Sequence, residues 1–199
     1  MRQSIAKLSA LAQAYEGEAK LVFYYAGHGL PKEGTDEPYL IPVDVSSSNL
    51  DYAIKLEDVF NKLTEHSSER VTVFLDACFT GGARNQPLVA ARGVRIKPKS
   101  PFVMGNLVVF SASSEDQTAH PYKEKAHGMF TYYLLKALQV SNGEMSYGEL
   151  EEFIRTNVMR KSVLVNNKVQ SPEVKVSPVF EYSWHEMRFT SSNEFSSNR

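Results

Sequence analysis

Three short apolar runs stand out along the chain, and each ends in small or polar residues. They cover residues 20–27 (KLVFYYAG), 71–77 (VTVFLDA) and 106–112 (NLVVFSA). Apolar side chains occupy most positions of each run, as in strands that are buried on both faces of a sheet. The pattern therefore predicts three central strands, the first of which ends at Gly27 and gives way to a turn-rich loop.

Between and after these runs, apolar residues recur at intervals of three and four, which is typical of helices with one buried face. Ser146 and Glu149 also have the spacing of a capping box at a helix start. Strands that alternate with helices predict an α/β fold with a mostly parallel sheet. The predicted helices cover residues 3–15, 54–66, 128–139 and a segment from Ser146, and the predicted short extended pieces cover 39–44 and 171–184, the latter at or near a sheet edge.

Two of the predicted strands lead into reactive side chains. The first runs into Gly27, His28 and Gly29, and the second into Cys78, the only cysteine of the chain. The carboxyl ends of parallel strands meet at one edge of a sheet, where active sites lie. Histidine is the usual base for a thiol nucleophile, and the amides of Gly29 and Cys78 would lie where an oxyanion hole is needed. The pattern therefore indicates nucleophilic catalysis by a Cys78–His28 pair.

Composition narrows the function classes. The chain has 199 residues, 42% of them apolar, which is enough for one domain with its own core. Its formal net charge is −1, so no basic field indicates a nucleic-acid partner. A single cysteine excludes an internal disulfide and any site with several cysteine ligands, and it favours a reducing, cytoplasmic compartment.

No stretch of the chain approaches the roughly 18 apolar residues of a membrane span, so no membrane partner is expected. Residues 1–14 (MRQSIAKLSALAQA) share some features with a signal peptide, because Arg2 comes first and small residues follow. Lys7 interrupts the apolar part, however, and the helical spacing favours an amphipathic helix.

The two reactive segments, YYAGHG (24–29) and FLDACFTGG (74–82), resemble the caspase-like cysteine peptidases, and most of all the metacaspases and their bacterial relatives. Caspases carry the pattern Gln-Ala-Cys-x-Gly with a histidine about 50 residues upstream. This chain has aspartate in place of the glutamine. Segments 39–44, 108–119 and 127–138 also resemble the family in matching order. The resemblance covers roughly residues 1–180 and implies a caspase-like three-layer sandwich.

The resemblance assigns roles to four residues. It makes Cys78 the nucleophile, His28 the general base or acid, and Gly29 part of the oxyanion hole. Asp76 takes the position that faces the pocket for the residue before the scissile bond. A carboxylate there favours arginine or lysine through charge-assisted hydrogen bonds. The expected partner is thus a peptide or protein substrate with a basic residue before the cleaved bond.

Simpler interpretations of the same residues remain open. A lone cysteine is often a small buried hydrophobe, and Asp76 could merely cap a turn. Ser111 and Ser113 follow the third strand, where they would bind substrate or simply terminate the strand.

Many metacaspases bind calcium through acidic loops, but this sequence has few of the acidic residues that such a site needs. Leu56 and Glu57 fall where the family more often has paired aspartates, and a solvated acidic loop accounts for the remaining acids equally well. No metal or cofactor is therefore expected, with calcium as the open alternative. The candidate acids are Asp36, Glu37, Asp44 and Asp58.

Caspase-like domains begin with a strand, a helix and a second strand that have no counterpart here. The resemblance therefore implies an incomplete domain over residues 1–185 that lacks the first two strands of the full domain and exposes an edge of strand 20–26. A preceding segment or a partner chain would supply those strands. Residues 186–199 are expected to form a disordered polar tail.

Residues 83–105 are basic, contain prolines and show no periodicity, so they are predicted to form a long loop. Caspase-like peptidases often cut themselves between the nucleophile strand and the next one. A protease selective for basic residues would find sites at Arg84, Arg92, Arg95, Lys97 and Lys99. An ordinary solvated loop remains the alternative.

Three functions are compatible with the sequence. The first is a cysteine endopeptidase that cleaves after arginine or lysine. The second is a non-catalytic caspase-like scaffold or binding module, which the missing strands favour and the intact His28 and Cys78 oppose. The third is a thiol hydrolase for small amides or esters, which would need a closed pocket instead of an open groove.

Overall fold

The computed structural model describes residues 1–45, 50–80, 98–114 and 117–190. Its α-helices are α1 (Arg2–Ala14), α2 (Leu56–Leu63), α3 (Met129–Ser141) and α4 (Tyr147–Asn166). Its strands are β1 (Lys20–Pro31), β2 (Pro38–Ile41), β3 (Ile54–Lys55), β4 (Arg70–Cys78), β5 (Leu107–Ser111), β6 (Pro121–Tyr122), β7 (His127–Gly128) and β8 (Glu173–Val176).

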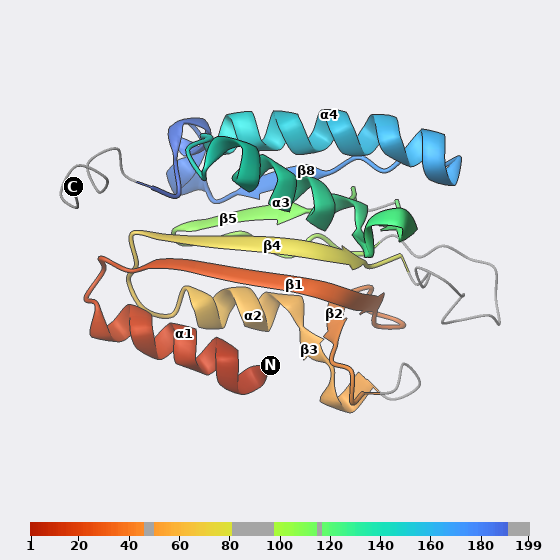
Figure 1. The fold of residues 1–199 in the computed structure, drawn as a ribbon. Coiled ribbons are helices and arrows are strands. Elements are labelled where there is room, and N and C mark those ends of the chain that lie inside the picture. The colour runs from red at the N-terminus through yellow and green to blue at the C-terminus, as the bar shows by residue number, and fades with distance from the viewer. Residues whose placement is uncertain (46–49, 81–97, 115–116, 191–199) are drawn as a thin grey trace.

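The molecule has three layers. A six-stranded sheet with the order β3-β2-β1-β4-β5-β8 lies in the middle, with α1 and α2 on one face and α3 and α4 on the other (Figure 1). β4 pairs in parallel with both β1 and β5, whereas β2, β3 and β8 add antiparallel pairs at the edges. The predicted α/β sandwich with parallel strands at its centre is confirmed.

β1 is longer than the sequence predicted. The expectation that it ends at Gly27 is wrong, because the strand continues to Pro31. β2 causes the difference: its residues pair antiparallel with His28–Pro31, and this pairing supplies backbone partners beyond the point where β4 ends. His28 therefore lies within a strand, where β1 passes from one neighbour to the other.

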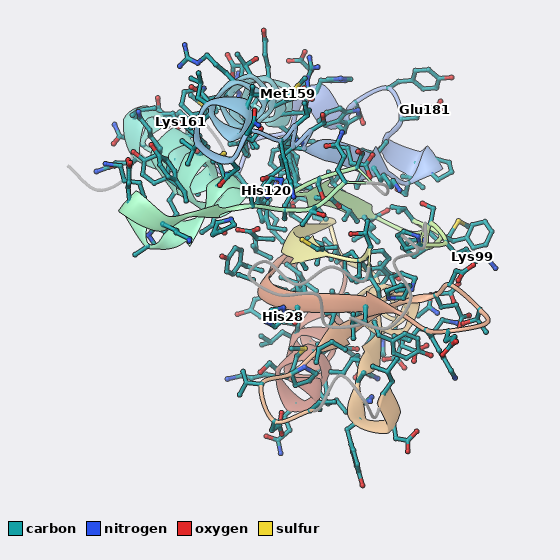
Figure 2. The ribbon with its side chains drawn as sticks, turned by 90° about the vertical axis from the view of Figure 1, so that its right-hand side faces the viewer. His28, Lys99, His120, Met159, Lys161 and Glu181 are labelled. Atoms are coloured by element: carbon teal, nitrogen blue, oxygen red, sulfur yellow. The ribbon has the colours of Figure 1, made fainter. Side chains whose placement is uncertain are left out.

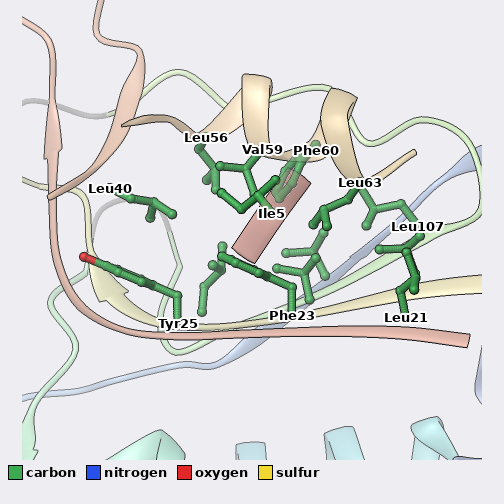
Figure 3. Packing of buried hydrophobic residues seen from close by; sticks show 14 of the residues in the cluster. Ile5, Leu21, Phe23, Tyr25, Leu40, Leu56, Val59, Phe60, Leu63 and Leu107 are labelled. Atoms are coloured by element: carbon green, nitrogen blue, oxygen red, sulfur yellow. The ribbon is translucent and has the colours of Figure 1, made fainter. Parts of the chain in front are cut away.

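One hydrophobic core lies between the sheet and α1 with α2. Leu21, Phe23 and Tyr25 of β1 point into it and meet Ile5 and the apolar face of α2 (Figure 3). The alternate β1 residues face the other way, and Val22 and Tyr24 are 48% and 46% exposed. β4, in contrast, is buried at every position, as its continuous apolar pattern predicted.

A second core lies between the sheet and α3 with α4. It contains Phe110 and Tyr147, whose rings meet edge to face with centroids 5.4 Å apart. α4 begins with the predicted capping box: the Ser146 hydroxyl accepts from the Glu149 amide, and the Glu149 carboxylate accepts from the Ser146 amide. This pairing satisfies two backbone donors that the helix start would otherwise leave free.

Two segments that were each predicted as one helix or one strand consist of more than one element in the structure. Segment 54–66 splits into β3 and α2, and segment 171–184 is a strand only over β8, at the sheet edge. After β8 the chain forms two 3-10 turns, Pro178–Phe180 and Trp184–Glu186. Proline at the first position of the earlier turn has no amide hydrogen for a strand ladder, which accounts for the end of β8.

The first residues assigned to the polar tail pack on the domain. The carbonyl of Met187 accepts from the Tyr147 amide, and the Phe189 ring lies 5.0 Å from the Tyr147 ring. Residues 191–199 lie outside the described part of the chain. Within the described residues, no helix combines the length and the apolar character that crossing a bilayer requires.

Candidate active site

The structure brings His28 and Cys78 side by side. β1 and β4 pair in parallel from Lys20 with Arg70 up to His28 with Cys78, which is the last pair of the ladder. Neighbouring strands lie roughly 4.8 Å apart, so the two residues are adjacent although 50 positions separate them in the sequence. Figure 2 faces this edge of the sheet and shows His28 on β1, with the end of β4 above it.

Both side chains belong to the same face of the sheet. Cys78 packs with the core on the α3 side, and Tyr24 of β1 reaches α3 through a 2.7 Å hydrogen bond to Thr131. Since side chains alternate along a strand, His28 shares the face of Tyr24 and thus that of Cys78. The pairing therefore puts a thiol and an imidazole on adjacent strands and on one face of the sheet.

The Cys78 thiol is covered in this structure. Its residue is only 4% exposed. The amide of Ala119 donates to the sulfur over 2.8 Å, and the thiol donates to the Ala119 carbonyl over 3.3 Å. The segment that follows β5 therefore lies against the sulfur, and a substrate carbonyl needs an opening there.

His28, in contrast, is exposed and borders an open groove. The groove is also lined by Gly27 and by the segment 41–45, which includes Asp44. Below it, the hydroxyl of the buried Tyr25 lies 2.7 Å from the His28 carbonyl and 3.0 Å from that of Ile41. Tyr25 thereby fixes the backbone that carries the histidine.

Gly29 lies where β1 passes close to the chain beyond Cys78. A methyl group added at Gly29 would stand 2.5 Å from the Phe79 ring and 2.8 Å from the Cys78 carbonyl oxygen. No side chain fits there without displacing Phe79 or the backbone, so glycine is required by packing.

Asp76 is completely buried on the α3 face, two positions before Cys78. Its carboxylate accepts hydrogen bonds from the Thr131 amide over 3.2 Å and from the Thr131 hydroxyl over 2.5 Å. Tyr24 in turn donates to that hydroxyl. A carboxylate at the first turn of α3 also interacts favourably with the helix dipole. Asp76 therefore joins β4 to α3, and it lies two positions before Cys78 on the same strand.

Ser111 and Ser113 line a second, largely apolar cavity at the same edge of the sheet. Ala77 and Phe79 contribute to it from β4 and its continuation, so it opens on the α2 face, opposite the side of the Cys78 thiol. The Ser113 hydroxyl donates to the Gln117 carbonyl. Lys99, Lys175 and Glu173 also line the cavity, and Lys175 pairs with Glu173 at 3.4 Å.

The acidic candidates for calcium do not form a cluster in the described part of the chain. There, no group of three or more His, Cys, Asp or Glu residues has an arrangement that could hold a metal ion. Glu37 pairs with Lys55 at 2.8 Å, and Lys55 also pairs with Glu57 at 2.7 Å. The hydrogen bond from Lys55 lowers the pKa of the Glu37 carboxyl and keeps it charged.

Four of the predicted self-cleavage sites, Arg84, Arg92, Arg95 and Lys97, lie outside the described residues, whereas the fifth, Lys99, is described. The part of the loop that is described begins at residue 98. There the Lys99 amide donates to the Asp36 carbonyl over 2.7 Å, which ties the end of the loop to the turn between β1 and β2.

Sequence reasoning missed the residues that hold the site in place. Tyr25 fixes the backbone of His28, Ala119 contacts the thiol, and Thr131 binds Asp76. Gln170, 92 positions after Cys78, secures the segment around Ala119. Of these, only Tyr25 carried a signal, as a tyrosine among the apolar residues of a buried strand, where its hydroxyl needs a partner.

A sheet with parallel central strands, covered by helices on both faces, in which the β1–β4 ladder ends at His28 and Cys78, is consistent with a caspase-like fold. The sequence profile described as the caspase domain matches residues 1–182, and the chain belongs to this family.

Known proteins agree with this assignment. The chain is 25% identical over 180 residues to a probable protease of a Desulfuromonadales bacterium, and it spans 21% of that relative's length. A crystal structure of a Geobacter sulfurreducens protein superposes with a TM-score of 0.63 at 15% identity, covering 94% of this chain and 76% of that one. Caspase-1 from Spodoptera frugiperda superposes with a TM-score of 0.53 at 13% identity, and the match covers 88% of this chain and 67% of that one. These two structures support the fold.

The bonds between Asp76 and Thr131 lead to a stability prediction. Asp76→Ala leaves the buried amide and hydroxyl of Thr131 without their acceptor, so we expect it to lower the free energy of unfolding by about 1–3 kcal/mol. Asp76→Asn keeps an acceptor oxygen and should cost less. Urea unfolding at neutral pH measures both variants, and equal stability of Asp76→Ala and the unmodified protein would show that these bonds do not hold α3 to the sheet.

Proposed function

We propose that this protein is a cysteine endopeptidase in which Cys78 and His28 form the catalytic dyad. The observation that supports the proposal is the register of β1 and β4, which makes these two residues the last pair of a parallel ladder. Membership of the caspase domain family is consistent with it. Sulfur and imidazole supply the chemistry, and the proposed reaction uses no cofactor.

In the proposed mechanism, His28 accepts the proton of the Cys78 thiol while the sulfur attacks the carbonyl carbon of the scissile bond. The amides of Gly29 and Cys78 stabilise the negative charge that develops on the carbonyl oxygen. His28 then gives its proton to the leaving amine, and a thioester remains on Cys78. Water, deprotonated by His28, hydrolyses the thioester and restores the thiol. A thiol that must stay reduced is consistent with a reducing, cytoplasmic compartment.

Asp76 is the proposed determinant of specificity for a basic residue before the scissile bond. Its carboxylate lies on the face of the nucleophile, two positions from it. An arginine or lysine side chain would bind this carboxylate through charge-assisted hydrogen bonds, alongside those that it accepts from Thr131. Ser111 and Ser113 are the proposed contacts for another part of the substrate, through the cavity that they line.

The cover over the thiol favours a second candidate function. With Cys78 only 4% exposed, a caspase-like module that binds a partner without cleaving it would also fit. The two functions differ in one readily measured property, since only the peptidase needs Cys78 to be chemically competent.

The dyad predicts a graded loss of activity. Cys78→Ala should abolish cleavage of a peptide library, because no other thiol exists in the chain. His28→Ala should lower kcat/KM by roughly 10²–10⁴-fold through loss of the general base. The measurement is fluorogenic peptide cleavage by purified protein, with His66→Ala as the matched histidine control, which should keep full activity. Residual cleavage by Cys78→Ala would remove Cys78 from the mechanism.

The role of Asp76 predicts a preference for positive charge. Substrates with arginine or lysine before the scissile bond should exceed those with aspartate in kcat/KM by at least roughly 10²-fold, since a like charge is repelled and an opposite one is hydrogen-bonded. Asp76→Asn removes the charge while keeping an acceptor for Thr131. It should therefore lower this ratio of kcat/KM values, while lowering the free energy of unfolding less than Asp76→Ala does. An unchanged ratio in Asp76→Asn would assign specificity to another residue.

A further inference from the structure

Residues 117–120, which we call the strap, lie over the thiol and are held by a buried side chain far along the sequence. Gln170 is 0% exposed. Its side-chain oxygen Oε1 accepts a hydrogen bond from the His120 backbone amide over 2.8 Å. Its side-chain nitrogen Nε2 donates to the carbonyl of Ala112, the residue after β5, over 2.8 Å. One side chain thereby joins the strap to the sheet immediately beside Ala119.

The backbone of Gln170 is fixed as well. Its amide donates over 3.0 Å to the hydroxyl of Ser162, a fully buried residue of α4. The strap is thus connected, through Gln170, to α4 on one side and to β5 on the other. Figure 2 shows His120 on the strap, above β4 and across from His28.

A second connection holds the start of the strap. The Gln117 side chain accepts from the Ser171 amide over 2.6 Å and donates to the Ser171 hydroxyl over 3.3 Å. Gln117 is partly exposed, so this connection is less buried than that of Gln170. The two adjacent residues Gln170 and Ser171 therefore hold both ends of the segment that contains Ala119.

We propose that Gln170 is a positioning residue that acts on the nucleophile through the strap. It keeps the strap over Cys78 until a peptide substrate displaces it. This inference rests on the proposed peptidase function. The cover itself is visible in the two contacts of Ala119 with the sulfur. Loosening Gln170 raises the fraction of molecules with an open site, and apparent substrate affinity rises with that fraction.

The primary test measures access to the thiol, because Cys78 is the only cysteine and intact mass reports its alkylation without ambiguity. Gln170→Leu retains most of the volume and removes both side-chain hydrogen bonds, and Gln117→Ala loosens the strap at its less buried end. Each variant should react with iodoacetamide faster than the unmodified protein, by roughly tenfold for the loss of a buried hydrogen bond. Gln117→Ala carries the test if Gln170→Leu does not fold.

Thr72→Val is the matched control. It deletes the 2.6 Å buried hydrogen bond between Thr72 and Tyr147, away from the strap. The control should leave the alkylation rate unchanged in native buffer. If Thr72→Val is also alkylated faster, the effect comes from a general loss of stability and the proposal is overturned. Unchanged alkylation rates in both Gln170→Leu and Gln117→Ala would overturn it as well.

Peptidase kinetics separate this proposal from the function on which it rests. The proposal predicts a lower KM in the strap variants with little change in kcat, because substrate no longer has to displace a firmly held strap. A rise in alkylation with a fall in kcat/KM would make the strap part of the substrate site and overturn the proposal. If every form alkylates as predicted but none cleaves peptides, the peptidase function fails while the role of Gln170 as the holder of the cover stands.

Discussion

The parallel register between β1 and β4 is the constraint on which the rest of the site depends. It makes His28 and Cys78 the final pair of one ladder. Because side chains alternate along each strand, a shift of one residue would move one of the two partners to the opposite face. The buried alternation of Leu21, Phe23 and Tyr25 against α1 and α2 specifies that register from the other side of the sheet. The same strand pairing therefore sets both the packing of the core and the juxtaposition of His28 and Cys78.

The contacts around the dyad also link it to the remaining layers. Asp76 joins β4 to the start of α3 through Thr131, and Gln170 joins the strap to α4 and to the end of β5. The histidine is open to solvent while the thiol is covered by the backbone of Ala119. If the proposed dyad is correct, the base is accessible to substrate while the nucleophile still lies under Ala119.

Much of this arrangement was predictable from the sequence. Continuous apolar runs located β1, β4 and β5, and the glycines around His28 together with the lone Cys78 indicated the two residues that the structure pairs at the end of the β1–β4 ladder. The length of β1 was not predictable, because it depends on pairing with β2 after the chain has turned. The cover by Ala119 and the bonds of Thr131 and Gln170 arise from contacts across 41 to 58 positions. Such contacts leave no periodic signal in the sequence.

Labelling of the single thiol by a peptide-directed reagent tests the central claim most directly. A short peptide that ends in arginine and carries a thiol-reactive ketone should add its mass to Cys78 in the unmodified protein. In His28→Ala we expect the labelling rate to fall by roughly 10²-fold or more, because the thiol loses its base, while iodoacetamide still reaches Cys78 after denaturation. Equal labelling rates in the two proteins would show that His28 does not activate Cys78 and would contradict the dyad.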